Sequence, residues 1–236
     1  MVENIVIFDF DETIGSFIQI KVFWEAIKYL FEYTDNNTDI LNNIIKLFPD
    51  CFRPKIFKIL TYLVKLRENG KCKYIMIYSN NPNKIWIEQI CTFINIKLKT
   101  KVFDKIICAF KSKGQIIDIS RTSNEKNITD LLKHISLPLN TKCCFIDDQY
   151  YNLMYTDNVY YINIKPYIFS YKNTIIIDTF YNKYSNLINI SYYKYKSNTL
   201  FFMDNYKFPI KDDDEHKIDI IISKKLYQHI KNYFTN

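Results

Sequence analysis

Short apolar runs that end in polar residues recur along most of the chain. Runs of strand length, rich in β-branched residues, lie at 4–9, 73–78, 102–109, 142–146 and 159–164. Between them, apolar side chains at helical spacing predict helices over 21–33, 38–48, 55–69, 84–93 and 127–134. Strands that alternate with helices indicate parallel pairing through right-handed crossovers. We therefore expect an α/β fold with a parallel central sheet flanked by helices.

The pattern changes beyond Pro166. Tyrosines become frequent, and segments such as Thr199–Met203 read as alternating rather than helical. Residues 211–215 read as an acidic turn, and apolar spacing returns in a terminal helix over 223–234. This part of the chain is expected to be an α+β extension.

These differences predict a division of the chain. We expect a Rossmann-like domain over 1–165, with a small insert at 14–51 that could form a cap, and an extension over 166–236 that packs on this core. One helix, one strand and a loop account for most of 81–125, which leaves no room there for a second, larger insert.

Composition adds two constraints. With 236 residues and 48% hydrophobic content, the chain can bury one sizeable core and an appendage. The net charge of +7 would attract phosphorylated or acidic substrates, although abundant Lys, Asn, Ile and Tyr also fit AT-rich coding.

Cysteine spacing and hydropathy bear on the compartment. The 6 cysteines have no Cys-x-x-Cys spacing, and scattered cysteines fit a reducing compartment. No leader-like segment and no apolar run of membrane length occur, so we expect a cytoplasmic or nuclear protein without a membrane partner.

Polar side chains follow three of the predicted strands at the point where each ends. Asp9 follows Ile5–Phe8, Ser79 follows the second strand, and Asp147 follows the fourth. Open α/β sheets bind ligands at the carboxyl ends of their strands, so these residues should converge. Each also has a plainer reading: solvated loop acids, an ordinary Ser-Asn-Asn-Pro turn, and a helix N-cap.

The run Asp9-Phe10-Asp11-Glu12-Thr13 after a hydrophobic strand resembles the Asp-x-Asp-x-Thr motif of the haloacid dehalogenase (HAD) superfamily of phosphohydrolases. The resemblance implies that Asp9 attacks phosphorus and forms an aspartyl-phosphate. It implies that Asp11 is the general acid and then the general base, and that Thr13 holds the loop and Asp11.

The remaining motifs of that superfamily have counterparts here. Ser79 and the main-chain N–H of Asn80 would bind the phosphoryl oxygens, and Lys126 would stabilise the aspartyl-phosphate. Alternatives to this lysine are Lys111, Lys113, Lys133 and Lys142. Asp147 and Asp148, with Asp9 and the main-chain carbonyl of Asp11, would hold one Mg²⁺.

Asp9–Ile14 and the dipeptide Arg53-Pro54 are similar to the branch that dephosphorylates the C-terminal tail of RNA polymerase II. The likeness implies a phosphoprotein substrate and covers about 4–165. Asp148 departs from it, because that branch has Asn there. Relatives of this kind with AT-rich coding occur in large DNA viruses, so we expect a viral source.

Two alternatives remain open. One is a phosphatase of nucleotides, small molecules or nucleic-acid ends. The other is a protein-binding scaffold whose site is dispensable. A role for nucleic acid is undecided, because core packing also explains the aromatic pairs near the C-terminus.

Overall fold

A parallel sheet organises the first part of the structure. The computed structural model describes residues 3–235, and its main sheet has the strand order β3-β2-β1-β6-β7. The strands are β1 (Asn4–Phe8), β2 (Tyr74–Tyr78), β3 (Lys105–Ile107), β6 (Lys142–Asp147) and β7 (Val159–Asn163). Ile5–Phe8 are fully buried because β1 is central and covered on both faces, which explains its unbroken apolar run.

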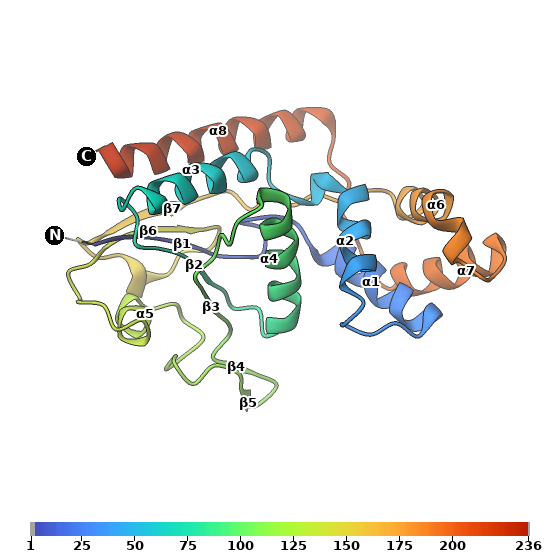
Figure 1. Cartoon of the computed structure of the whole chain (residues 1–236), viewed down its shortest axis with the longest axis horizontal. Coiled ribbons are helices and arrows are strands. Elements are labelled where there is room, and N and C mark those ends of the chain that lie inside the picture. Colours follow the sequence, from blue (N-terminus) through green and yellow to red (C-terminus); the bar gives the residue numbers. More distant parts are fainter. Residues whose placement is uncertain (1–2, 236) are drawn as a thin grey trace. The chain divides into compact units, whose positions relative to one another are not determined.

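Helices cover both faces of this sheet. They are α3 (Ile56–Glu68), α4 (Lys84–Leu98), α5 (Ile128–His134) and α8 (Asp213–Thr235). Helices α3 and α8 lie side by side on one face, where the rings of Tyr62 and Tyr227 meet at 5.6 Å, and α5 lies on the other (Figure 1). Ile7 and Phe145 pack with Leu131 of α5 in one buried cluster. The expected α/β class with a helix-flanked parallel sheet is confirmed.

The chain divides into two compact units. One consists of the chain up to Ile14, Arg53–Tyr167 and the chain from Ile218 onward, and contains the sheet. The other consists of Gly15–Phe52 and Ile168–Lys217. The sequence separated these segments differently, with one extension over 166–236; in the structure, this stretch is shared between the two units.

The second unit is helical. Its elements are α1 (Ile18–Phe31), α2 (Thr38–Leu47), η1 (Pro49–Cys51), α6 (Asn173–Tyr184), η3 (Ser185–Leu187) and α7 (Tyr192–Met203). Its two segments are joined by buried contacts: the amide of Gln19 bonds both the carbonyl and the N–H of Tyr171, and the Phe23 and Phe180 rings meet at 5.4 Å. The expected insert at 14–51 is therefore helical, with a second segment completing its core.

The two ends of the Gly15–Phe52 insert meet. Gly15 and Phe52 form an antiparallel bridge, and the N–H of Ser16 donates to the carbonyl of Cys51. A Cβ on Gly15 would lie 2.4 Å from the Cys51 carbonyl oxygen, so only glycine fits here.

The expectation of strands beyond Pro166 is wrong, because the described residues after β7 form helices and loops. Thr199–Met203 belongs to α7, and its buried positions Tyr195, Thr199 and Met203 repeat every four residues. The acidic stretch is the start of α8: the N–H of Glu215 donates to Asp212 Oδ1, and the N–H of Asp212 donates to Glu215 Oε2.

Two smaller differences concern the region after α4. The expected strand 102–109 shortens to β3, because the Asp104 carboxylate takes the N–H of Ile75 in place of a main-chain partner. The polar stretch after it forms a short hairpin, β4 (Lys111–Ser112) with β5 (Gln115–Ile116).

Over residues 3–235, no helix combines the length and the apolar character that crossing a bilayer requires. In the same range all six cysteines are buried, and none of them is recorded in a disulfide.

Candidate metal centre

Three strand ends meet at the point where the strand order of the sheet reverses. Strands β2 and β6 flank β1, and Phe8 pairs with Ile77 on one side and Ile146 on the other. This register sets Asp9 level with Asp147 on the neighbouring strand, at a separation of about 4.8 Å between strands. A reversal of this kind is where open α/β sheets bind ligands.

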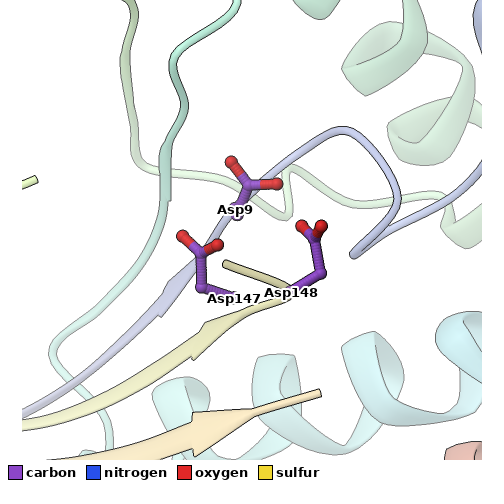
Figure 2. Close-up of side chains that lie close together, drawn as sticks. All are labelled: Asp9, Asp147 and Asp148. Carbon is purple, nitrogen blue, oxygen red and sulfur yellow. The ribbon is translucent and has the colours of Figure 1, made fainter. Parts of the chain in front are cut away.

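Three carboxylates gather at this edge. Asp9, Asp147 and Asp148 each contribute an oxygen that lies within 4.8 Å of the others, and Asp9 and Asp147 are buried. Figure 2 shows Asp9 on the loop after β1 and the other two at the end of β6, with their carboxylates turned toward a common space. This buried cluster could hold a metal ion.

Lys126 bridges two of these carboxylates. Its Nζ lies 2.6 Å from Asp9 Oδ1 and 2.6 Å from Asp147 Oδ2, and its side chain is 1% exposed. The four alternative lysines are all exposed. Lys126 precedes α5, whose N-cap Asn127 accepts the N–H of Thr129, so the start of this helix fixes where the lysine enters the site.

The cluster holds more negative charge than Lys126 balances. Burial raises the pKa of Asp9, against the opposing field of Lys126. Burial also raises the pKa of Asp147 to about 7, although Lys126 lowers it, and Asp9 adds to the rise. Burial and the charges of Asp148, Asp11 and Asp9 raise the pKa of Glu12 as well. A bound cation would relieve this excess.

The carboxylate of Asp148 is held from two sides. Thr13 Oγ1 donates to its Oδ1 at 3.3 Å, and the Gln149 amide donates to its Oδ2 at 2.8 Å. The N–H of Gln149 also donates to Asp147 Oδ1. Thr13 was expected to support Asp11, whereas its hydroxyl contacts Asp148 on the loop after β6.

Ser79 and Asn80 follow β2 at the same edge. Ser79 is buried, and its Oγ accepts the N–H of Asn81 at 3.0 Å. The Asn80 amide donates to the hydroxyl of Tyr151 at 2.9 Å. The main-chain N–H of Asn80 is the group that the superfamily resemblance implies would bind the phosphoryl oxygens.

Asp11 lies outside the carboxylate trio. Its Oδ2 accepts a hydrogen bond from Asn81 Nδ2 at 2.8 Å, which joins the loop after β1 to the loop after β2. Asp11 is half-buried, whereas Asp9 is buried. The two aspartates of the motif thus have different surroundings.

Arg53 holds the loop after β1. Its guanidinium donates to the carbonyls of Thr13 and Glu12, each at 2.6 Å, and to the carbonyl of Lys165 at 2.9 Å. Glu12 adopts a φ of 59°, a left-handed conformation that side chains rarely take and that these bonds hold in place. Burial lowers the pKa of Arg53 to about 10, with the charge of Asp219 acting against the fall, so the side chain stays cationic at neutral pH.

Arg121 holds the chain after β2 and β3 in a similar way. It is buried and donates to the carbonyls of Ser79 at 3.1 Å, Cys108 at 2.9 Å and Asn124 at 3.0 Å. These bonds link the ends of β2 and β3 to the loop that carries Lys126. Each arginine therefore ties three chain segments around the cluster.

Sequence reasoning missed Asn81, Arg121 and Gln149, and singled out Arg53 only as part of the Arg53-Pro54 likeness. Asn81 carried a usable signal, since it follows Ser79 by two residues in the same turn. Arg121 carried none, and the contacts of both arginines have no sequence signal, because their partners are main-chain carbonyls.

Comparisons of the chain with models of protein families, with curated proteins and with solved structures found no significant match.

Proposed function

We propose that this chain is a Mg²⁺-dependent phosphohydrolase of the HAD type, with Asp9 as the nucleophile. One observation carries the proposal. A buried lysine bridges Asp9 and Asp147 at the reversal of strand order, where Asp148 completes a trio of carboxylates. The chain order Asp9, Ser79, Lys126, Asp147 follows the motifs of that superfamily.

The donor set fits a hard divalent cation. Carboxylate oxygens are the ligands that Mg²⁺ prefers. Burial raises the pKa of Asp147 to about 7, and the charge of Asp9 adds to the rise, so a cation at the cluster would favour the charged carboxylate. Asp9, Asp147 and Asp148, with the main-chain carbonyl of Asp11, would hold the ion. When bound, Mg²⁺ would draw negative charge from the phosphoryl oxygens and orient them for attack.

The chain's own residues would divide the remaining tasks. A carboxylate oxygen of Asp9 attacks phosphorus while the bond to the leaving oxygen breaks, and the aspartyl-phosphate forms. Lys126 stabilises the charge that gathers there. The oxygen of Ser79 already accepts the N–H of Asn81, so its own proton is available to a phosphoryl oxygen.

Asp11 would transfer the protons. It gives one to the leaving oxygen in the first step, then takes one from the water that attacks the aspartyl-phosphate and frees Asp9. The Asp11 carboxylate is not one of the three in the cluster, and its Oδ2 accepts a hydrogen bond from Asn81.

The site gives less information about the class of substrate than about the chemistry. A phosphoserine in a flexible protein tail is the first substrate to test, because Asp9–Ile14 and Arg53-Pro54 are similar to the RNA polymerase tail phosphatases. Nucleotides and 3′- or 5′-phosphorylated DNA ends are the other arms of one panel, assayed at equal concentration with Mg²⁺.

Replacing the nucleophile tests the chemistry. Asp9→Asn should lower hydrolysis of an aryl phosphate by at least about 10³-fold, because an amide oxygen is a far weaker nucleophile. Asp157→Asn, which changes an exposed acid on the loop before β7, is the matched control and should keep full activity. Turnover by Asp9→Asn at the rate of this control would overturn the assignment.

Removing the metal tests the cofactor. Excess EDTA should abolish hydrolysis by the unchanged protein, and Mg²⁺ added beyond the chelator should restore it. Undiminished activity in EDTA would exclude a catalytic divalent cation.

A further inference from the structure

Asn81 contacts Asp11 from the neighbouring loop, where its Nδ2 donates to Asp11 Oδ2 at 2.8 Å. Three hydrogen bonds fix its position besides that contact. Its N–H donates to Ser79 Oγ at 3.0 Å, its carbonyl accepts the N–H of Ala109 at 3.3 Å, and its Oδ1 accepts the N–H of Asn83 at 2.8 Å. The residue is therefore held by β2, by the chain after β3 and by the start of α4.

These bonds also determine which way the amide faces. The N–H of Asn83 can only donate, so the Asn81 atom that meets it must be the oxygen. The NH₂ group then faces Asp11 Oδ2 at 2.8 Å. The side chain of Asn83 caps α4 by accepting the N–H of Trp86, so this orientation rests on a helix.

We propose that Asn81 is a positioning residue that holds Asp11 in the orientation needed for proton transfer. The inference rests on the proposed phosphohydrolase function. An amide NH₂ donates and cannot accept, so it favours the form of Asp11 in which Oδ2 is the acceptor and the transferable proton is carried by Oδ1.

The two proton transfers are then assigned to one oxygen. In the first step the proton leaves Oδ1 for the leaving oxygen as the bond between that oxygen and phosphorus breaks. In the second step Oδ1 takes a proton from water as the water oxygen bonds to phosphorus and the bond from phosphorus to Asp9 breaks. Oδ2 stays bound to Asn81 throughout.

The competing explanation is that Asn81 only anchors the loop and does not influence Asp11. Two variants of Asn81 separate the anchoring role from the positioning role. Asn81→Asp keeps an oxygen for the N–H of Asn83 but turns a second oxygen toward Asp11, so it preserves the anchor and removes the donor. Asn81→Ala removes both. Asn83→Ala is the matched control, because it weakens the same loop by removing the α4 cap and leaves the donor to Asp11 in place.

The readout is kcat/KM for phosphate monoesters whose leaving alcohols become steadily more basic, from nitrophenol to simple alkanols. A strongly basic leaving group requires a proton from Asp11, and a weakly basic one does not. Both Asn81 variants should lose about 10²-fold on alkyl phosphates and less than about 10-fold on nitrophenyl phosphate. Asn83→Ala should keep the wild-type dependence on leaving group.

Each outcome supports or overturns the positioning role of Asn81. An equal loss on all substrates would reduce Asn81 to a structural role, and unchanged kinetics of Asn81→Asp would overturn the inference. If Asn81→Ala fails to fold by circular dichroism, Asn81→Asp carries the test alone. Absence of hydrolysis by the unchanged protein with Mg²⁺ would overturn the proposed function and this inference together, whereas an active protein with a parallel loss overturns only the inference.

Discussion

Lys126 is a cation that is almost completely buried. Burial lowers the pKa of its ammonium, and the charges of Asp9 and Asp147 more than reverse that effect, so the net pKa is raised. The side chain stays charged only because both carboxylates are within 2.6 Å. Fold stability and the charge balance of the site therefore depend on the same three residues.

Lys126→Met should lower the free energy of unfolding in EDTA at neutral pH by about 3–5 kcal/mol, since two buried carboxylates lose their partner. Lys133→Met, on the exposed side of α5, should change it by less than about 0.5 kcal/mol. Urea denaturation measures both. Mg²⁺ should restore part of the loss in Lys126→Met, and equal midpoints for the two variants would contradict the pairing.

At the scale of single residues, the sequence predicts the site side chains that follow strands and misses those that bind main-chain carbonyls. Asp9, Ser79 and Asp147 each come after an apolar run, so their convergence follows from parallel pairing. Lys126 was selected by its place before a short helix. Arg53 and Arg121 bind main-chain carbonyls, which have no sequence signature. The Arg53-Pro54 likeness drew attention to Arg53 but not to this role, and only the folded chain shows the contacts of the two arginines.

Among the elements, α8 differs most from its expected extent. The terminal helix was expected over 223–234 and begins at Asp213. The first helical turn of α8 is acidic, and in the sequence alone a run of acidic residues suggests a surface loop. In a helix the same charges satisfy free N–H groups and the positive end of the dipole.

Asp212→Ala should therefore destabilise the start of α8 by about 1 kcal/mol, because the N–H of Glu215 loses its acceptor. Amide hydrogen exchange should quicken at 213–217 and stay unchanged at 226–232. Asp214→Ala removes only an exposed ion pair with Lys217 and serves as control, with an effect below about 0.5 kcal/mol. Equal protection in the two variants would show that the reciprocal cap contributes nothing.

Helix α7 was missed for a different reason. Its apolar side chains are consecutive at 200–203 instead of spaced by three and four, so periodicity gives no helical signal. The packing of α7 against α1 and α6 decides its structure. Tertiary contacts override local preference most easily where the local pattern is weak.

For the molecule as a whole, buried thiols and phenols predict weakness toward base. Burial raises the pKa of Cys72 and Cys143 to about 12 and that of Cys108 to about 11, from 9.0 in an unfolded chain. Burial likewise raises the pKa of Tyr171 and Tyr233. Above about pH 9 the folded chain keeps protons that the unfolded chain releases, so stability is full below that pH and falls as pH rises toward 11–12.

Urea midpoints should consequently fall between about pH 8 and about pH 10.5 in a fully reduced sample. Replacing Cys143 by Ala should make this fall shallower, because one of the raised groups is gone, even if the midpoint at pH 8 is lower. A midpoint that is flat over this range would mean that the thiols are not shielded as their burial implies.

The chain passes between its two units at Ile14–Gly15, Phe52–Arg53, Tyr167–Ile168 and Lys217–Ile218. On a ribosome, the face of the sheet that carries α3 cannot gain α8 until α8 has emerged, and by then every residue of the helical unit has been synthesised. A fragment cut at 165, the boundary that the sequence suggested, would bare the side of α3 where Tyr227 packs and take Asp219 from Arg53. Expression of residues 1–165 alone should therefore yield insoluble material, and a soluble fragment that contains the sheet must retain α8.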